Sequence, residues 1–110
     1  MDVTETISGD ISIVKVKGSL DANAADNLEA FINNLISAKK IKLIIDLEGV
    51  DYTSSSGLRV MLATLKRIKN ENGILKVANI QPDVRDIFEI SGFTSLFEFY
   101  NSEAEALKAF

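Results

Sequence analysis

The sequence predicts an α/β fold: a mostly parallel mixed sheet of about five strands with four helices and an N-terminal hairpin. Two periods of apolar residues support this fold class, because side chains repeat every second residue along strands and every three to four residues along helices. Read from the N-terminus, these periods give the order β-β-α-β-α-β-α-β-α, which favours right-handed crossovers between parallel strands. The length of 110 residues suits one domain, which we expect to span residues 1–110.

The chain begins with two short apolar runs that predict a hairpin. Val3, Glu5 and Ile7 alternate with threonines, and residues 11–16 form a second extended run rich in isoleucine and valine. Gly9 lies between the two runs, and a turn that contains glycine between short strands is typical of a hairpin. The second strand is expected to end at the segment beginning with Gly18.

The first helix is predicted over residues 24–38. Its apolar side chains recur at helical spacing and form one face. This face consists of Leu28, Phe31, Ile32, Leu35 and Ile36. Asp21 or Asn23 can cap the N-terminus, since both side chains accept a hydrogen bond from a free helix N–H. Lys39 and Lys40 follow the helix, where positive charge interacts favourably with the helix dipole.

The next strand and helix have the clearest patterns in the chain. Residues 42–47 form a near-continuous apolar run that contains Asp46, which predicts a strand buried on both faces. A helix over residues 55–70 follows, because apolar residues again form one stripe. The stripe consists of Leu58, Met61, Leu62, Leu65 and Ile68. The dipeptide Asn72-Gly73 then marks a turn.

The last third of the chain repeats the alternation with shorter elements. Residues 74–78 predict a fourth strand, and Pro82 opens a third helix. The apolar side chains of this helix are Val84, Ile87, Phe88 and Ile90. A fifth strand is predicted over residues 97–100 and a final helix over residues 102–110. The final helix begins with a capping box formed by Ser102 and Glu105.

The composition narrows the functional classes. A net charge of −4 argues against a surface that follows nucleic-acid phosphates. The chain has no cysteine and no histidine, which excludes disulfides, thiolate metal sites and Ser-His-Asp or Cys-His nucleophiles. Glycine loops that hold nucleotide phosphates are also missing. We therefore expect a protein that is not an enzyme, with no cofactor or metal.

No apolar run reaches the ~20 residues that a membrane helix needs. The N-terminus has acidic residues and lacks the basic and then apolar segments of a signal peptide. These features predict a cytoplasmic protein without direct membrane insertion.

Four hydroxyl residues (TSSS, residues 53–56) separate the buried strand from the second helix. The first interpretation is structural, because a short hydroxyl side chain can cap a helix N-terminus and contribute ~1 kcal/mol. Capping uses one hydroxyl and does not require three successive serines. The second interpretation is a regulated hydroxyl, since a phosphate there adds about −1.5 to −2 charge beside free N–H groups and a favourable dipole. Both interpretations stay open at this point.

Residues 47–62, LEGVDYTSSSGLRVML, resemble the signature of the STAS domain in anti-sigma-factor antagonists. That signature runs Asp-Leu, a few residues, Tyr or Phe, a small residue, Asp or Ser, Ser, then Ser, Thr or Ala, and Gly-Leu before an apolar helix. The earlier segment GSLD, residues 18–21, resembles the family's Gly-x-Leu-Asp. Gly57 and Leu58 set the register, so Ser55 matches the family's phosphorylated serine and Ser56 matches its neighbour.

The resemblance implies a protein-binding function. In such antagonists the unphosphorylated protein binds an anti-sigma factor, which is also a serine kinase of the GHKL type, and a sigma factor is released. Phosphorylation ends the binding and a PP2C-type phosphatase restores it, while ATP belongs to the partner. The expected phosphorylation site is Ser55. The expected partner-binding residues are Asp21, Asn23, Thr53, Ser54, Ser56, Gly57, Arg59 and Val60.

Two of these residues lie on the second helix after Gly57. Arg59 is four residues after Ser55 and therefore on the same side of that helix. Val60 lies off the apolar stripe and is expected to be an exposed contact for a partner.

Ser54 departs from the family pattern, because many phosphorylated members carry an aspartate directly before the target serine. The departure leaves two alternatives open. The first is a constitutive, non-phosphorylated STAS subunit of a larger regulatory or lipid-transport assembly. The second is a STAS module that senses an anion or a nucleotide at the same helix end.

Overall fold

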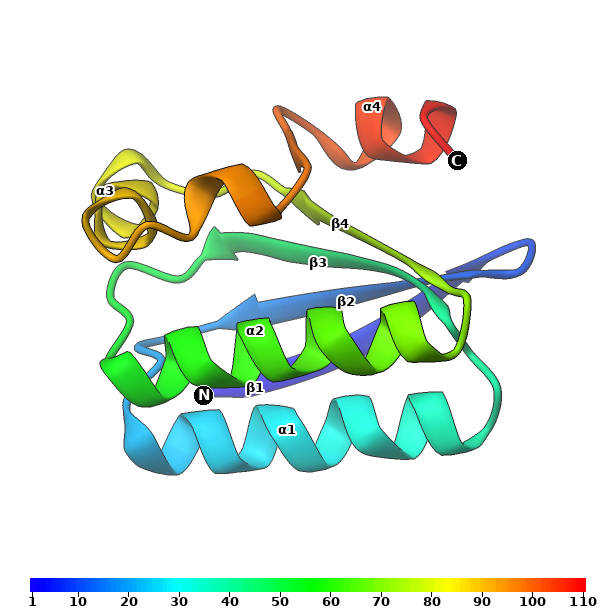
Figure 1. The fold of residues 1–110 in the computed structure, drawn as a ribbon, viewed down its shortest axis with the longest axis horizontal. Helices are drawn as coiled ribbons and strands as arrows, with labels where there is room; N and C mark the ends of the chain where they lie inside the picture. The colour runs from blue at the N-terminus through cyan, green and yellow to red at the C-terminus, as the bar shows by residue number, and fades with distance from the viewer.

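A five-stranded mixed sheet forms the centre of the computed structural model, which describes residues 1–110 (Figure 1). Its strands are β1 (Asp2–Ser8), β2 (Ile11–Lys17), β3 (Lys42–Gly49), β4 (Ile74–Ala78) and β5 (Phe99–Tyr100). They lie side by side in the order β1-β2-β3-β4-β5. β1 pairs antiparallel with β2, and every later pair is parallel. The predicted α/β fold, with its N-terminal hairpin and mostly parallel sheet, is therefore confirmed.

Four α-helices cover the two faces of the sheet unequally. They are α1 (Ala22–Ser37), α2 (Ser55–Asn70), α3 (Pro82–Ile90) and α4 (Glu103–Lys108), and a short 3-10 helix, η1 (Thr94–Leu96), follows α3. α1 and α2 lie side by side on one face, and α4 lies on the other (Figure 1). None of the helices combines the length and the apolar character needed to cross a membrane.

The main core lies between the sheet and helices α1, α2 and α3. β3 shows how the two faces divide, because alternate side chains of a strand point in opposite directions. Leu43, Ile45 and Leu47 belong to the main core, whereas Ile44 belongs to a smaller cluster under α4. All four side chains are buried, so the predicted burial of this strand on both faces is confirmed.

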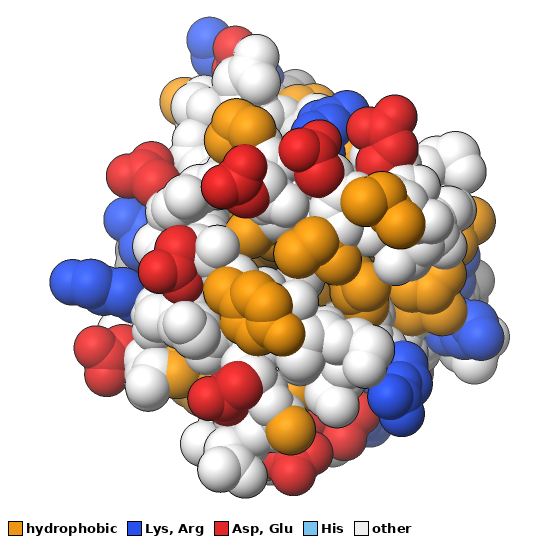
Figure 2. Space-filling model, turned by 90° about the vertical axis from the view of Figure 1, so that its left-hand side faces the viewer, with side chains coloured by type: hydrophobic (Ala, Val, Ile, Leu, Met, Phe, Trp, Pro, Cys, Tyr) orange, Lys and Arg blue, Asp and Glu red, His pale blue; other side chains and the backbone are white.

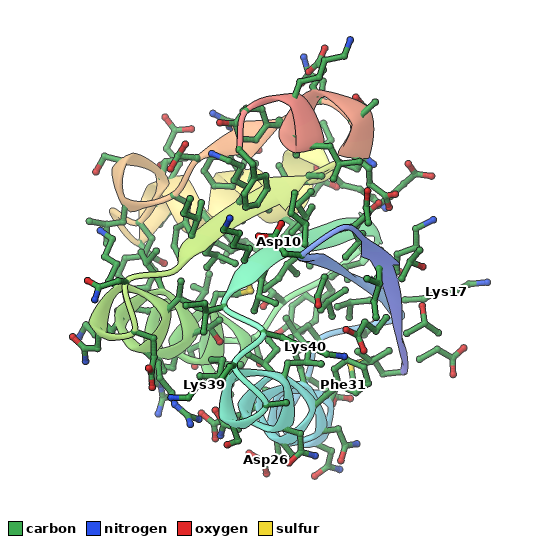
Figure 3. The ribbon with its side chains drawn as sticks, turned by 90° about the vertical axis from the view of Figure 1, so that its right-hand side faces the viewer. Asp10, Lys17, Asp26, Phe31, Lys39 and Lys40 are labelled. Carbon is green, nitrogen blue, oxygen red and sulfur yellow. The ribbon has the colours of Figure 1, made fainter.

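Ion pairs join the hairpin to the start of β3, at the end of the molecule that faces the viewer in Figure 3. Lys42 Nζ lies 2.7 Å from Asp10 Oδ2, and Lys40 Nζ lies 3.0 Å from Glu5 Oε2. Hydrogen bonds from Ser12 and Lys40 hold the pKa of Glu5 below its ordinary value. These contacts attach β1, which is an edge strand, to the rest of the fold.

The helix predicted over residues 24–38 starts two residues earlier, at Ala22. Asp21 is its N-cap and accepts the N–H of Ala24 at 2.9 Å, so Asn23 becomes part of the helix. Asp21 is the cap because Leu20 is buried at the end of the loop after β2 and the chain turns into the helix at the next residue.

The buried face of α2 is wider than the predicted apolar stripe, because α2 packs against α1 as well as against the sheet. Val60 and Thr64 are buried, whereas Leu62 is only half-buried. The expectation that Val60 is an exposed contact is therefore wrong: it is 6% exposed and belongs to the main core.

The short elements near the C-terminus differ most from the predictions. Ile90 is 86% exposed, because α3 is only nine residues long and buries Val84 and Phe88 instead. The strand predicted over residues 97–100 is reduced to β5, because η1 precedes it and Phe97 turns into the main core.

The capping box of the final helix is confirmed in one of its two hydrogen bonds. Ser102 Oγ accepts the N–H of Glu105 at 3.0 Å, as predicted. The Glu105 carboxylate accepts the N–H of Asn101 at 3.2 Å, one residue before the expected donor. The helix also ends at Lys108, before the predicted residue 110.

Candidate functional site

Two loops at the carboxyl ends of the parallel strands meet at the start of α2. The loop after β2 pairs with the loop after β3 through a parallel bridge between Leu20 and Thr53. The N–H of Leu20 donates to the carbonyl of Tyr52 at 2.8 Å, and the N–H of Ser54 donates to the carbonyl of Leu20 at 2.9 Å. These hydrogen bonds bring Asp21, at the start of α1, close to the hydroxyl residues that precede α2.

Ser54 is the N-cap of α2, and its hydroxyl takes part in two hydrogen bonds. Its Oγ accepts the N–H of Gly57 at 3.2 Å and donates to the carbonyl of Leu20 at 2.9 Å. An ionised aspartate in this position can accept the first bond but has no proton for the second. The serine therefore ties the start of α2 to the loop after β2 without placing a negative charge beside Ser55.

Ser55 is the first residue of the 16-residue helix α2, and it is exposed. Its hydroxyl makes no hydrogen bond within the protein, in contrast to that of Ser54. The N–H groups in the first turn of a helix lack intrahelical acceptors and give that end a partial positive charge. A negatively charged group on Ser55 would lie beside these donors, so this position can hold a phosphate without unfolding the helix.

Thr53 and Gly57 are buried under the loop that precedes α2 and are not available to a partner. Thr53 is 3% exposed and donates its hydroxyl to the carbonyl of Ser54 at 3.1 Å. Gly57 is buried against Leu20: a Cβ added there would lie 2.8 Å from two Leu20 side-chain atoms and would also overlap Thr53 Oγ1. The expectation that these two residues contact a partner is corrected, because the isolated bridge draws the loop onto α2.

The predicted residues that remain accessible lie on neighbouring segments. Asp21, Asn23 and Arg59 are exposed, and Ser54 and Ser56 are half-buried. Arg59 follows Ser55 by about one helical turn. Together with Ser55, these residues form the part of the predicted surface that a partner can touch.

Tyr52 is an accessible residue that sequence reasoning did not select. It is 51% exposed and directly precedes the hydroxyl residues. Figure 2 shows this end of the molecule, where apolar side chains gather near the centre and acidic side chains surround them. An aromatic residue in the turn between a strand and a helix was the available indication, since exposed aromatic residues often anchor protein interfaces.

A groove of about 440 Å³ runs between α1 and α2 next to this surface. Its α1 side carries Asp26 and Glu29, and its α2 side carries Arg59 and Lys66. Ser56 lies in its lining, so the groove continues from the hydroxyl residues along the two helices.

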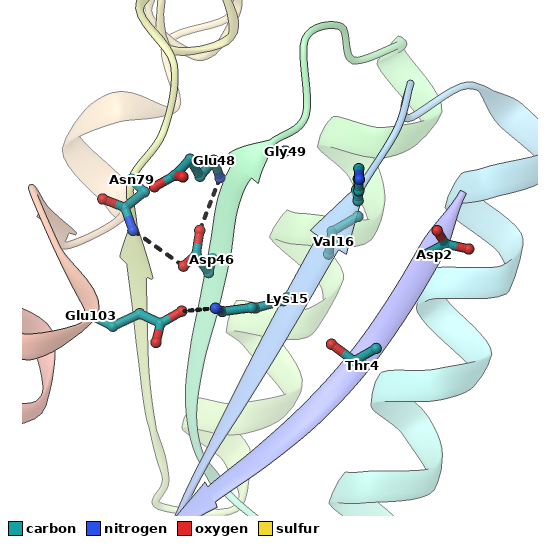
Figure 4. A pocket seen from close by; sticks show the side chains of 10 residues that line it. Asp2, Thr4, Lys15, Val16, Asp46, Glu48, Gly49, Asn79 and Glu103 are labelled. Atoms are coloured by element: carbon teal, nitrogen blue, oxygen red, sulfur yellow. Dashed lines mark hydrogen bonds and ion pairs between the residues drawn. The ribbon is translucent and has the colours of Figure 1, made fainter.

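A separate cavity of about 540 Å³ lies on the other face of the sheet, beside α4 (Figure 4). Polar side chains of β1, β2 and β3 line most of it, and none of the predicted site residues is among them. No group of three or more acidic, histidine or cysteine side chains is arranged to hold a metal ion anywhere in the protein.

The sequence matches the family model of the STAS domain over residues 3–106. The chain belongs to the STAS domain family. This STAS domain is 37% identical over 98 residues to BtrV of Bordetella bronchiseptica, which is named as a candidate anti-sigma factor antagonist; the match covers 89% of this chain and 84% of BtrV.

Solved structures show the same fold. An anti-sigma factor antagonist from Mycobacterium paratuberculosis gives a TM-score of 0.88 with this STAS domain at 28% identity, over 98% of this chain and 92% of the other. The Bacillus cell fate determinant SpoIIAA in its phosphorylated form gives a TM-score of 0.77 at 21% identity, over 98% of each chain. The family match thus agrees with the resemblance of residues 47–62 to the STAS signature.

Proposed function

We propose that this STAS domain is an anti-sigma-factor antagonist whose binding to an anti-sigma factor ends when Ser55 is phosphorylated. The observation that carries the proposal is the contrast between two neighbouring serines. The hydroxyl of Ser54 is held by two hydrogen bonds, whereas that of Ser55 is exposed and free. The names of BtrV and of the M. paratuberculosis protein support the antagonist function, and SpoIIAA shows that the fold accepts phosphorylation.

The kinase activity would come from the partner, an anti-sigma factor of the GHKL serine-kinase type that holds ATP. In the transfer, Ser55 Oγ forms a bond to the γ-phosphorus, ADP leaves, and the hydroxyl proton passes to a base on the partner. A PP2C-type phosphatase would hydrolyse the phosphoserine and restore the free hydroxyl. Ser55 is suited to this role because its hydroxyl can be reached without breaking any hydrogen bond of the fold.

Phosphorylation would change the surface and leave the fold intact. The phosphate adds about −1.5 to −2 charge at a position where free helix N–H groups can donate hydrogen bonds to it. An interface that closes over the neutral hydroxyl would instead have to desolvate this charge, which is costly without a matching cation. Affinity for the partner is therefore expected to fall while the stability of the domain stays nearly constant.

The docking surface would combine residues from the start of α1 with residues around the start of α2. Asp21 and Asn23 supply polar groups on the first element, and Ser56 and Arg59 supply them on the second. Tyr52, in the loop between β3 and α2, adds an exposed aromatic ring. We exclude Thr53, Gly57 and Val60 from direct contact because they are buried.

The test compares Ser55→Ala with Ser55→Asp. Each variant is expressed with an affinity tag in the native host, co-purifying anti-sigma factors are identified by mass spectrometry, and the dissociation constant of each complex is measured with purified proteins. Ser55→Ala should bind as the unmodified protein does, and Ser55→Asp should bind at least about tenfold more weakly, since ~1.4 kcal/mol corresponds to a factor of ten.

Ser95→Asp is the matched control, because it adds the same charge to an exposed serine in η1, away from the proposed surface. It should bind like the unmodified protein. Equal affinities for Ser55→Ala and Ser55→Asp would contradict the switch. The proposal also requires that mass spectrometry of the phosphorylated protein locates the phosphate on Ser55, and not on Ser54 or Ser56.

A constitutive subunit of a larger assembly is the second candidate function. The observation that favours it is Ser54, which stands where many phosphorylated members carry an aspartate and leaves Ser55 without an adjacent carboxylate. In that case the protein should stay unmodified during both growth and stress, and the same partners should co-purify in both conditions.

A further inference from the structure

α4 is the only helix on the second face of the sheet, and a small apolar cluster, to which the half-buried Leu107 and Phe110 also contribute, holds it there. Its one fully buried side chain, Ala106, packs on Ile13, Ile44 and Ala78. A helix of six residues is not stable on its own in water, so α4 depends on this docking.

Two carboxyl groups that line the same cavity lie near one another where α4 begins (Figure 4). Asp46 on β3 is 5% exposed, and its two oxygens accept the N–H of Glu48 at 2.9 Å and the side-chain amide of Asn79 at 3.1 Å. Glu103, the first residue of α4, reaches toward Asp46 from above the sheet. Its Oε2 is buried, has no hydrogen-bond partner and lies 3.5 Å from Lys15 Nζ.

The positively charged side chains around Asp46 and Glu103 do not balance the negative charge that a second ionised carboxyl group would add. Lys15 is the nearest cation, but its side chain is mostly exposed and its contact with Glu103 is longer than a good hydrogen bond. Lys76, under the other end of α4, is already paired with Glu98 at 2.8 Å. The charged residues that line the adjoining cavity are Asp2, Lys15, Lys17, Asp46, Glu48 and Glu103, so carboxyl groups outnumber cations. Glu105, also on α4, is engaged by the N–H of Asn101.

Contact with the Asp46 carboxyl group, burial and the negative charge of Asp46 raise the pKa of Glu103 above its ordinary value of 4.5, and Lys15 opposes these effects only in part. The cause is geometric, because two carboxyl groups in contact cannot both ionise without repulsion. A proton on Glu103 turns that repulsion into a hydrogen bond to Asp46.

We propose that a proton on Glu103, hydrogen-bonded to Asp46, latches α4 to the sheet, so that the docking of α4 weakens as the pH rises. Docked α4 binds this proton more tightly than released α4 does. The latch is therefore complete at a pH below the ordinary pKa of glutamate. It is lost as the pH rises through the higher pKa that Glu103 has when α4 is docked. For each unit by which docking raises the pKa of Glu103, loss of the proton lowers the equilibrium constant for docking of α4 about tenfold.

Release of α4 would uncover Ile13, Ile44 and Ala78, which lie on the face opposite α1 and α2. The surface around Ser55 is built on the main core and would stay in place. The latch is therefore independent of the proposed phosphorylation switch, and either one can fail without the other.

The experiment measures two quantities on the full chain by NMR between pH 4 and pH 8. The first is the titration of the Glu103 and Glu105 side-chain carboxyl signals. The second is the hydrogen-exchange protection of α4 amides such as that of Ala106, corrected for the intrinsic dependence of exchange on pH. In the unmodified protein, Glu103 should titrate above its ordinary pKa value of 4.5, and α4 protection should fall over the Glu103 titration while β3 and β4 amides stay protected.

Glu103→Gln should keep α4 protected up to pH 8, because the amide donates a hydrogen bond to Asp46 and cannot ionise. Glu105→Gln is the matched control: it removes the same charge from the same helix and should preserve the pH dependence of the unmodified protein. The proposal is overturned if Glu103 titrates at or below its ordinary pKa value of 4.5, if corrected α4 protection is constant from pH 4 to pH 8, or if Glu103→Gln loses protection as the unmodified protein does. The first two outcomes need no variant, so they hold even if a substitution disturbs folding.

Discussion

The two faces of the sheet are built by different physical means. The face under α1, α2 and α3 is closed by a continuous apolar core, whereas the face under α4 has a small apolar cluster and several charged groups. Lys76 illustrates the second face: it is 3% exposed, lies over the rings of Tyr100 and Phe110 at 5.1 and 5.2 Å, and pairs with Glu98. Burial lowers the pKa of Lys76, but hydrogen bonds and charge from Glu98 and Tyr100 outweigh it and raise the pKa overall.

The two proposals together describe a small domain that combines a fixed binding surface with a movable element. The segments that surround Ser55 begin or end on elements of the main core, so their geometry is maintained by dispersion contacts and apolar burial that do not depend on pH. α4 rests on a small apolar cluster, in which Ala106 is its one fully buried side chain and Leu107 is half-buried, and on titratable groups. Regions with few buried apolar contacts open at lower free-energy cost than the core does.

The largest effect is expected from a cavity in the main core. Leu28 on α1 is fully buried, so Leu28→Ala should lower the free energy of unfolding by about 2–5 kcal/mol. Urea denaturation followed by circular dichroism measures the change. Ile90→Ala is the control and should stay within about 0.5 kcal/mol, because Ile90 is 86% exposed. A small effect of Leu28→Ala would remove the distinction between the faces.

A smaller effect is expected where the main core meets the binding surface. Gly57→Ala places a Cβ 2.8 Å from Leu20 side-chain atoms, and both residues are buried. Overpacking of this kind should cost about 1–3 kcal/mol and should also weaken partner binding, since the loop that presents Ser55 must move. Ser56→Ala, in the same turn, should leave the urea midpoint nearly unchanged. If Gly57→Ala were neutral in both assays, the loop would not be braced as described.

The smallest effect on global stability is expected on the second face. Ala106→Asp puts a charge under α4, and the helix should leave the sheet because that costs less than burying the charge. We expect a loss of roughly 1 kcal/mol, with faster hydrogen exchange confined to the residues after β5. Ala104→Asp adds the same charge on the exposed side of α4 and should have no such effect. Faster exchange in α1 or α2 would show that the faces are not separable.

The sequence was sufficient for elements whose local pattern and tertiary role agree. The apolar run around Asp46 and the regular stripe after Ser55 predicted β3 and α2 correctly, and the hydroxyl residues predicted the helix start. The register set by Gly57 placed the candidate serine at the first residue of α2, where it is exposed.

The sequence could not predict features that depend on a second packing partner. Val60 lies off the stripe that faces the sheet, and only the presence of α1 beside α2 buries it. Thr53 is hidden because a bridge to Leu20 forms between loops that are distant in the chain. The contact between Asp46 and Glu103 has the same origin, since α4 returns across a face that no local pattern assigns to it.

The strands lie in the sheet in the same order as in the chain, and this has a consequence for the way the protein is made. Each strand pairs with the one synthesised just before it, so no strand has to insert between two that are already joined. The hairpin closes the shortest loop, and each later crossover adds one strand at the open edge. Short sequence separation between partners favours fast folding, and with β1 fixed as one edge, each new strand pairs at the opposite edge while the ribosome is still adding residues.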